Sequence, residues 1–262
     1  MTPLYDRIGS GYPRYRRPDA RLVKRLIEAL GPTVRAVVDV GAGTGKYARA
    51  LASAGLRVTA VEPSSRMLEQ AALHPGVTYL AGTAEALPLA TASADAAICV
   101  IAMSHFPDVD LALREMDRIT SRGTIVNVTI DPRVAEPYWF PDYFPEVAAA
   151  NLARSEPIGA LEARFRRVLG RSVTTSVIPI PADFEDLFTG AAWSRPELYL
   201  EESFRRSAAS FALAPATSTE AAVRRLERDL VSGAFAQRYP ALRQRTAWDV
   251  GLRLMRVAPT SE

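Results

Sequence analysis

A glycine-rich loop, Asp39-Val40-Gly41-Ala42-Gly43-Thr44-Gly45, is the feature that most restricts how this chain folds. It follows an apolar run at 34–40, which predicts a buried strand, and it precedes a predicted helix that ends near Ala54. Glycine has no side chain to obstruct a ligand, and the first turn of a helix offers unpaired backbone N–H groups. The loop therefore predicts a strand–loop–helix unit that binds a ligand at the carboxyl end of its strand.

The same alternation of strand and helix continues to residue 131. Apolar runs predict further strands at 57–61, 77–81, 95–102 and 123–130, with helices from Ser64 to about Leu73 and over 109–119. Earlier in the chain, Asp19 is placed to cap a helix that ends at Gly31-Pro32. The run 95–102 is almost continuously apolar, as expected for a strand with both faces covered. This order predicts an α/β fold with a parallel sheet and right-handed crossovers.

The pattern changes after Asp131, where residues 132–157 are rich in proline and aromatic side chains. We expect a helix at 158–169, a strand at 172–180, a mostly helical region at 182–240 with a break at Pro215, and a last strand at 246–257. We interpret 1–30 as an arm and helix over the ligand and 31–131 as the ligand-binding core. Segments 132–157 and 182–240 then form a cap over the sheet edge, and 158–181 and 241–262 complete the core.

Three ligand classes use glycine loops of this kind. A phosphate-binding P-loop requires G-x-x-x-x-G-K-[ST], but Tyr47 follows Lys46 and the first glycine falls on Val40. A dinucleotide fingerprint requires G-x-G-x-x-G, and its third glycine falls on Lys46. The third pattern, acidic-x-G-x-G-x-G, matches at every position and is the first motif of class I S-adenosylmethionine-dependent methyltransferases. The alternative is a loop that only makes a tight turn.

Glu62 supports a nucleoside ligand, because it ends the second predicted strand 21 residues after Gly41. An acid at that strand end is placed to accept hydrogen bonds from both ribose hydroxyls. Taken alone, Glu62 is equally explained as an ordinary exposed carboxylate.

Five segments together resemble the ordered motifs of the type 11 methyltransferases, the ubiquinone/menaquinone-biosynthesis type. They are VVDVGAGTGKYARAL, VEPSSRML, GTAEALPL, DAAICVIAMSHF and GTIVNVTID, which cover about 34–131. The segments YDRIGSGYPRYRRPDARL and DLFTGAAWSRPELYLEESFRRSAASFA also resemble a bacterial small-molecule subfamily. The resemblance implies a Rossmann-like sheet of seven strands, the last antiparallel, with helical cap insertions. It also implies S-adenosyl-L-methionine as the cofactor and no metal.

The resemblance assigns roles to residues around that cofactor. Glycines 41, 43 and 45 would contact the methionine moiety and Glu62 the ribose, while Met67 would pack on the adenine. The adenine edge would lie at Thr83, Ala84 and Glu85. Many relatives carry aspartate where this chain has Thr83, so backbone groups or Glu85 are the alternatives for recognising the adenine amine. The full predicted set is Tyr5, Arg16, Asp39, Gly41, Ala42, Gly43, Gly45, Glu62, Pro63, Met67, Thr83, Ala84, Glu85 and Ile101.

Methyl transfer is an in-line displacement, so a protein mainly aligns the nucleophile and excludes water. A base is needed only if the acceptor must lose a proton. His105 follows the fourth strand, at the sheet edge where ligands bind, and is our candidate base; the alternative is a packing or hydrogen-bonding residue. In relatives the N-terminal segment folds over the cofactor, so Arg16 would pair with the methionine carboxylate. Tyr12 or Tyr15 would then face the reacting centre; the alternative is a solvated arm.

Aromatic residues in the predicted cap suggest an apolar acceptor pocket. A plain hydrophobic cap core explains the same residues equally well. The predicted acceptor-binding residues are His105, Tyr138, Trp139, Phe140, Phe144 and Trp193, with Tyr143 and Tyr199 in the same aromatic cluster.

Composition argues against a nucleic-acid partner despite a pI near 9.2. The formal net charge is only +3, and all but two of the 32 basic residues are arginines that are interleaved with acids. AMSHF follows the fourth strand where amino-adenine methyltransferases often carry Asn/Asp-Pro-Pro-aromatic. The single cysteine, Cys99, excludes a disulfide framework within the chain. The first residues lack the apolar core of a signal peptide, so we expect a cytoplasmic protein without a membrane partner. We expect the protein to be a monomer or a homodimer.

The sequence therefore predicts an S-adenosylmethionine-dependent methyltransferase of a small molecule, an aromatic or apolar secondary metabolite methylated at C, N or O. The alternative is a methyltransferase fold recruited for a non-methylating reaction such as a cyclisation.

Overall fold

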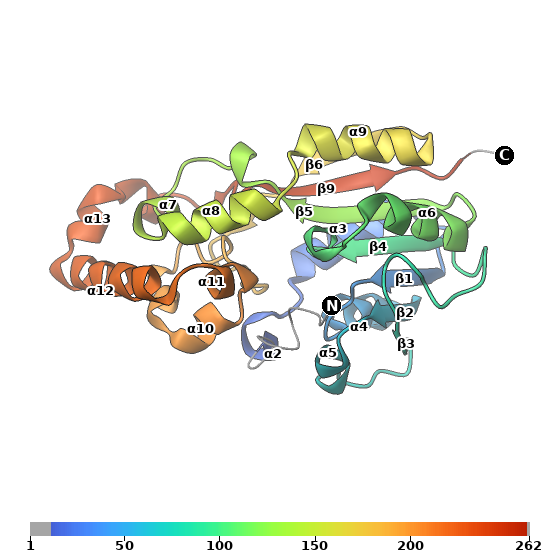
Figure 1. Ribbon diagram of the computed structural model, residues 1–262, viewed down its shortest axis with the longest axis horizontal. Helices are drawn as coiled ribbons and strands as arrows, with labels where there is room; N and C mark the ends of the chain where they lie inside the picture. Colours follow the sequence, from blue (N-terminus) through green and yellow to red (C-terminus); the bar gives the residue numbers. More distant parts are fainter. Residues whose placement is uncertain (1–11, 261–262) are drawn as a thin grey trace.

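The computed structural model describes residues 12–260. Within that range a seven-stranded sheet has the order β3-β2-β1-β4-β5-β9-β6, and β9 runs antiparallel to both of its neighbours. Its strands are β1 (Ala36–Val40), β2 (Arg57–Glu62), β3 (Val77–Ala81), β4 (Ala96–Val100), β5 (Thr124–Ile130), β6 (Val173–Val177) and β9 (Leu252–Val257). The predicted Rossmann-like sheet, with an antiparallel last strand, is confirmed (Figure 1).

Helices surround the sheet and gather at one end of it (Figure 1). The α-helices are α2 (Tyr12–Tyr15), α3 (Ala20–Leu30), α4 (Lys46–Ser53), α5 (Ser65–Glu69), α6 (Val109–Thr120), α7 (Phe140–Tyr143), α8 (Pro145–Arg154), α9 (Ile158–Leu169), α10 (Glu202–Arg206), α11 (Ala209–Leu213), α12 (Ala216–Ser232) and α13 (Ala234–Arg238). Short 3-10 turns are η1 (Met103–His105), η2 (Pro132–Val134), η3 (Pro196–Leu200) and η4 (Pro240–Arg243).

The central strands are buried on both faces because their side chains alternate between two cores. Val37 and Ile98 point into a core with α3 and α4, where Leu26 and Leu51 are fully buried. Their neighbours in sequence, such as Val38 and Cys99, point into a second core with α6 and α9. Cys99 is therefore a buried core residue.

Local capping signals act as the sequence predicts. The Asp19 side chain accepts a hydrogen bond from the Arg21 N–H at the start of α3, and the chain leaves the helix at Gly31 with φ 93°. The Ser64 side chain likewise accepts from the Met67 N–H at the start of α5. These bonds satisfy N–H groups that a helix leaves unpaired in its first turn.

Three predicted elements are shorter than expected. The helix after Ser64 ends at Glu69, because Pro75 disfavours helical backbone at the preceding residue and Leu73 is 93% exposed with no core to join. The strand at 172–180 leaves the sheet after Val177, and β7 (Ile180–Pro181) instead pairs with β8 (Ala247–Trp248). The last strand starts only at Leu252, because Gly251 turns the chain with φ 87° and a Cβ there would collide with the Asp131 carbonyl.

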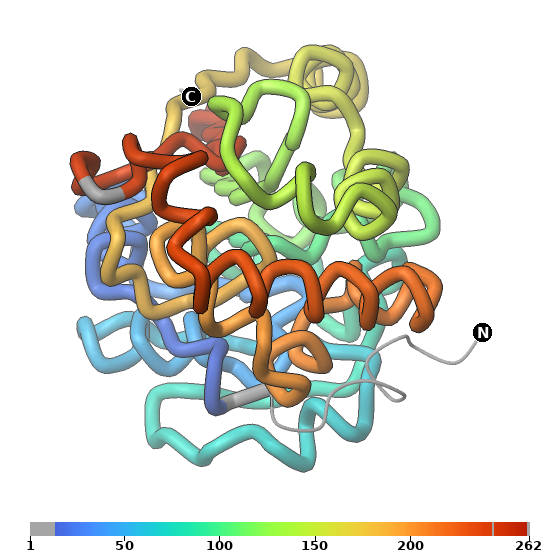
Figure 2. Tube along the Cα trace, turned by 90° about the vertical axis from the view of Figure 1, so that its left-hand side faces the viewer, coloured from blue at the N-terminus to red at the C-terminus, as the bar shows by residue number. Residues whose placement is uncertain are grey.

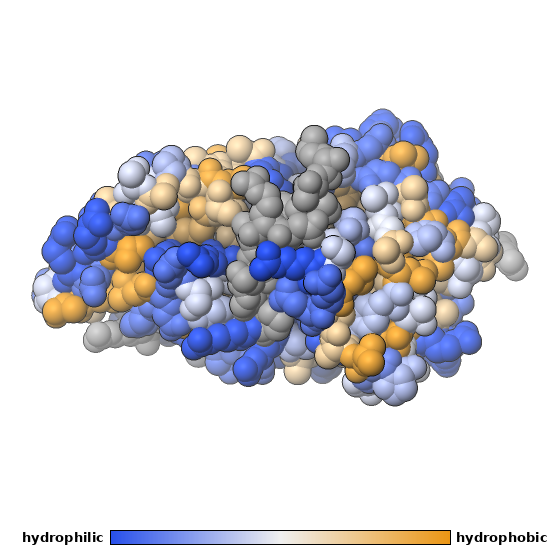
Figure 3. All heavy atoms as spheres, turned by 60° about the horizontal axis from the view of Figure 1, so that its bottom comes forward, coloured by the Kyte–Doolittle hydropathy of each residue, from blue (hydrophilic) through white to orange (hydrophobic). Residues whose placement is uncertain are grey.

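Helices α7, α8 and α10–α13 form a helical end with its own aromatic core, in which Trp139, Phe140 and Tyr199 are fully or almost fully buried. In Figure 2, the orange-red α12 crosses the face of the molecule nearest the viewer. Two exposed ion pairs on this end, Arg206–Glu202 and Arg224–Glu220, have the i,i+4 spacing of a solvated helix face. Figure 3 shows hydrophilic side chains along much of the visible face, with apolar atoms between them.

Among residues 12–260, none of the helices combines the length and the apolarity that a bilayer span requires.

Candidate active site

The glycine loop lies at the carboxyl end of β1 and depends on left-handed backbone. Gly41, Gly43 and Gly45 have φ values of 74°, 58° and 69°, a region that L side chains rarely adopt. The Gly41 and Ala42 N–H groups donate to the Val61 carbonyl at 2.9 and 3.1 Å, which ties the loop to β2.

The three glycines differ in what surrounds them. A Cβ on Gly41 would lie 2.7 Å from the Ala102 Cβ, and one on Gly45 would lie 2.5 Å from the Tyr79 ring. Around Gly43, the Met67 Cε is the one described atom that a Cβ would approach within 4 Å, at 3.3 Å. Gly41 and Gly45 are therefore closely packed, whereas the described residues leave room for a ligand beside Gly43.

Glu62 ends β2 and is 6% exposed, and each of its carboxylate oxygens is held by the backbone. The Gly43 N–H donates to Oε2 at 2.8 Å, and the Ser64 N–H donates to Oε1 at 3.0 Å. A carboxylate oxygen can accept more than one hydrogen bond, so these two backbone contacts do not by themselves occupy all the acceptor sites of Glu62. The residues present thus fit a nucleoside that lies against Gly43.

The predicted adenine contacts follow β2 and β3. Met67 is buried beside Gly43, and Ala84 is buried in the core next to α6. Thr83 and Pro63 are exposed, while the Glu85 carboxylate accepts from the Asp108 N–H at 3.4 Å. Contact with adenine by these residues stays a prediction.

Asp39 and Lys46 flank the loop and are both buried. Burial, together with the nearby Glu62 charge, raises the pKa of Asp39 to about 7. The Lys46 ammonium lies 2.6 Å from Asp186 Oδ1. The Asp39 side chain is therefore buried beneath the glycine loop and does not lie on its surface.

Asp186 is the centre of a buried ionic cluster that joins three distant segments. Its Oδ1 accepts from Arg16 Nε at 2.5 Å as well as from Lys46, and its Oδ2 accepts from the Tyr47 hydroxyl at 2.7 Å. Burial alone raises the pKa of Asp186, but Arg16 and Lys46 outweigh it and lower that pKa to about 2. The cluster fixes Arg16 beside the glycine loop, where pairing with the methionine carboxylate stays a prediction.

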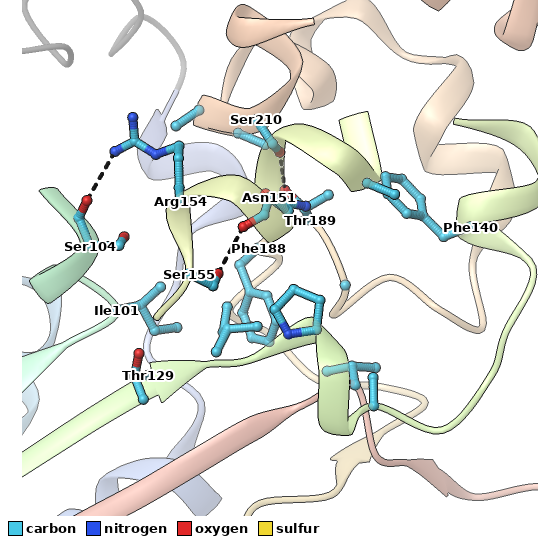
Figure 4. Close-up of a pocket in the computed structure, with 18 of the residues that line it drawn as sticks. Ile101, Ser104, Thr129, Phe140, Asn151, Arg154, Ser155, Phe188, Thr189 and Ser210 are labelled. Atoms are coloured by element: carbon cyan, nitrogen blue, oxygen red, sulfur yellow. Dashed lines mark hydrogen bonds between the residues drawn. The ribbon is translucent and has the colours of Figure 1, made fainter. Parts of the chain in front are cut away.

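A cavity of about 360 Å³ opens between the carboxyl ends of β4 and β5 and the helical end. That volume lies in the range of small-molecule sites. Figure 4 shows Ile101 and Thr129 on the sheet side and Phe188, Thr189 and Ser210 across from them. Ile101 has φ 53°, a strained value for a β-branched residue, and such strain concentrates at functional sites.

His105 lines this cavity, and its ring is engaged by Arg154. The Arg154 Nη2 lies 2.8 Å from His105 Nδ1 and 3.3 Å from the Ser104 carbonyl. A guanidinium can only donate, so Nδ1 is the acceptor and the ring proton resides on Nε2. Burial, followed by the charges of Arg154 and Arg16, lowers the pKa of His105 to about 4. This geometry favours a neutral hydrogen-bonding residue, the alternative to a general base.

The Tyr15 side chain does not line the cavity. The Tyr15 hydroxyl donates to Glu201 Oε2 at 2.7 Å, lies 2.6 Å from Ser203 Oγ, and its ring packs in the aromatic core. Its hydroxyl is therefore committed to the cap, which removes the structural basis for a role at the reacting centre. Tyr5 and the Tyr12 side chain lie outside the described residues.

Some aromatic residues of the cap line the wall of the cavity, and others are buried in the hydrophobic cores. Tyr138 and Phe140 line the cavity. Trp139, Phe144 and Trp193 are at most 1% exposed and lie in packed cores. They therefore have almost no exposed surface with which to contact an acceptor directly. Trp139 Nε1 donates to the Trp193 carbonyl at 2.7 Å, so this pair connects the cap to the sheet core through a buried hydrogen bond.

Asp186 and Arg154 are charged site residues that the sequence analysis did not identify. Asp186 is one of three acids in ADFEDLF, and Arg154 is one of many arginines. The one signal for Asp186 is an acid inside an apolar stretch, which does not distinguish it from Asp183 or Glu185.

Comparisons with known proteins agree with this geometry. A family model described as a methyltransferase domain matches residues 38–127. A ubiquinone/menaquinone biosynthesis C-methyltransferase of Rubrivivax gelatinosus is 37% identical over 103 residues, 38% of this chain and 41% of the relative. A malonyl-[acyl-carrier protein] O-methyltransferase of Erwinia billingiae is 42% identical over 88 residues, 33% of this chain and 35% of the relative. The chain thus matches less than half the length of these curated relatives.

A solved structure matches over nearly the whole chain. It is a putative methyltransferase from an antibiotic biosynthesis pathway of Anabaena variabilis, 38% identical, with a TM-score of 0.89 over 93% of this chain and 99% of that one. Identity at this level over nearly the full length of both chains establishes that they belong to one family. The protein belongs to the type 11 family of class I S-adenosylmethionine-dependent methyltransferases.

Proposed function

We propose that the protein transfers the methyl group of S-adenosylmethionine to a small-molecule acceptor with an aromatic or otherwise apolar body. The observation that carries this proposal is the cavity beside the strained end of β4, which has Ile101 and His105 at one side and Tyr138 and Phe140 in its wall. A site with apolar walls and a few directed polar groups is typical for small-molecule ligands.

The cofactor supplies a methyl group on a sulfonium that is already a good leaving group. The chain's own residues then have to hold and orient the reactants. Gly43 and Glu62 bind the nucleoside, Arg16 pairs with the carboxylate of its methionine part, and the helical end excludes water from the cavity. The neutral His105 ring orients the acceptor as a hydrogen-bonding group.

The names of the curated relatives do not specify the methylated atom. One curated relative is named as a C-methyltransferase and another as an O-methyltransferase. The Anabaena protein is described as belonging to an antibiotic biosynthesis pathway, which supports a secondary metabolite as the acceptor.

Label transfer tests the proposal directly. The purified protein is incubated with S-adenosylmethionine carrying an isotopic methyl label and with fractions of a bacterial metabolite extract. We expect S-adenosylhomocysteine to form in step with one labelled small product, as measured by mass spectrometry. Conversion of an extract component without S-adenosylhomocysteine formation would contradict methyl transfer and indicate a recruited reaction instead.

A further inference from the structure

Four charged side chains besides His105 line the cavity, and three of them have partners of opposite charge. Arg16 pairs with Asp186 at 2.5 Å. Glu136 pairs with Arg245, and Asp142 pairs with Arg238 at 3.5 Å. The fourth, Arg154, has no carboxylate within salt-bridge distance in the part of the chain that the structure describes.

Arg154 is nevertheless held in place. It is the last residue of α8, and its Nη2 contacts both the Ser104 carbonyl and His105 Nδ1. Its Nε and Nη1 groups have no hydrogen-bond acceptor among residues 12–260. Figure 4 shows Arg154 at one end of the cavity and Phe140 toward the other. The guanidinium is therefore oriented, with donors left over, at the end opposite an aromatic wall.

An uncompensated cation beside an apolar wall strongly favours an anionic ligand. Hydrogen bonds from a guanidinium to a carboxylate are charge-assisted and are stronger than neutral ones. Removal of water from such a cavity strengthens the attraction further, because the local dielectric constant falls. The neutral His105 ring and the Ser104 carbonyl do not supply the missing negative charge.

We propose that the acceptor is a monocarboxylate, whose carboxylate pairs with Arg154 while its apolar body lies toward Tyr138 and Phe140. A single guanidinium matches one negative charge, which favours a carboxylate over a phosphate ester. This inference rests on the proposed function, because it names the acceptor class of the same site.

Binding of a matched pair of probes tests the inference. The probes are 3-phenylpropionate and its neutral amide, 3-phenylpropionamide, added to the full-length protein with S-adenosylhomocysteine present and, separately, absent. Isothermal titration calorimetry measures both probes against wild type, Arg154→Gln and Arg154→Lys. Arg166→Gln is the matched control, since Arg166 lies on α9 with a half-exposed side chain paired to Glu162. Circular dichroism verifies that every variant is folded.

We expect wild type and Arg166→Gln to bind the acid about tenfold or more tightly than the amide. Arg154→Gln should bind the two equally, Arg154→Lys should keep part of the preference, and S-adenosylhomocysteine affinity should be the same in all variants. Equal binding of acid and amide by wild type would overturn the inference, as would a preference that survives in Arg154→Gln. Loss of S-adenosylhomocysteine affinity in Arg154→Gln would instead assign this arginine to the cofactor and overturn it too.

A further probe separates the two kinds of anion. Phenyl phosphate bound more tightly than 3-phenylpropionate would overturn the carboxylate assignment. Failure of the proposed function has a different signature, because no labelled methyl group would then reach a component of the metabolite extract, whatever the preference of wild type between acid and amide.

Discussion

The Glu62 carboxylate shows how a single residue is prepared for a ligand. Both oxygens already accept backbone N–H groups, from Gly43 and Ser64, so the side chain has one orientation. A carboxylate held in this way needs no reordering when a ribose binds, and pre-organisation of this kind increases affinity.

Substitution of Glu62 by glutamine should lower the affinity for S-adenosylhomocysteine by about ten- to a hundredfold. The amide loses the charge and turns an N–H group toward a backbone N–H, and hydrogen bonds to a charged acceptor contribute about 1.5–3 kcal/mol. Calorimetry measures the change, with Glu69→Gln, an exposed glutamate on α5, as the control. An unchanged affinity in Glu62→Gln would remove the ribose assignment.

His105 should be neutral throughout the range in which the enzyme works. Its pKa is lowered to about 4, so protonation sets in only as the pH falls toward that value. Turnover should therefore show no rise between pH 6 and 8 that depends on this residue, and His105→Gln, which keeps a donor, should retain most activity.

Nuclear magnetic resonance of the imidazole nitrogens checks this prediction, because the chain has only two histidines. The His105 signals, assigned by their loss in His105→Gln, should show the Nε2–H tautomer at neutral pH. A His105 titration midpoint near pH 6.5, coinciding with a rise in turnover, would restore the general-base role.

At the scale of elements, the Asp186 cluster joins α4 and the residue that follows α2 to the segment after β7. Arg16 and Asp186 also pair through their backbones as an isolated bridge, and the Leu187 N–H donates to the Tyr15 carbonyl at 2.9 Å. The residue that follows α2 and the first turn of α4 are thus held together by one buried acid.

Asp186→Asn should destabilise the fold by about 3–5 kcal/mol, because it leaves Arg16 and Lys46 buried without their shared anion. The measurement is the free energy of unfolding in urea, and Asp183→Asn is the matched control, since the Asp183 side chain is 81% exposed. A cost below about 1 kcal/mol would mean that the cluster contributes little.

The pH dependence of the same cluster has a definite sign. The folded-state pKa of Asp186 lies near 2, below the ordinary value of 3.8. Its stabilising contribution is therefore present in full above about pH 4 and is lost as the pH falls toward 2.

At the scale of the whole molecule, the helical end and the sheet are connected through buried side-chain contacts and not merely through a linker. Trp139 belongs to the aromatic core and Trp193 to the sheet core, yet the Trp139 side chain donates a hydrogen bond to the Trp193 carbonyl. The cavity lies between the two cores, so its shape depends on both.

Urea unfolding should therefore be one cooperative transition. Tryptophan fluorescence, which reports both cores through the buried Trp139, Trp193 and Trp248, should have the same midpoint as far-ultraviolet circular dichroism. Two resolved transitions would show instead that the helical end unfolds independently of the sheet.

The sheet core, the glycine loop and the position of Glu62 can be predicted from the sequence, because they depend on local signals. Strand and helix periodicity, the caps Asp19 and Ser64, and glycines at positive φ all act within a few residues. Three element boundaries differ from the prediction, at Glu69, Val177 and Leu252. At these places the end of the element depends on whether a neighbouring surface is present to pack against, which local propensity does not show.

Which cap residues line the cavity wall, and which charged side chains are paired, depends on contacts between residues far apart in the sequence. Arg16 and Asp186 are 170 residues apart, Tyr15 and Glu201 are 186 apart, and Arg154 and His105 are 49 apart. No local pattern distinguishes Arg154 from the other arginines of so arginine-rich a chain. Arg154 becomes distinctive only when folding places it in a cavity whose other charged residues each have a partner of opposite charge, and those pairings join side chains far apart in the sequence.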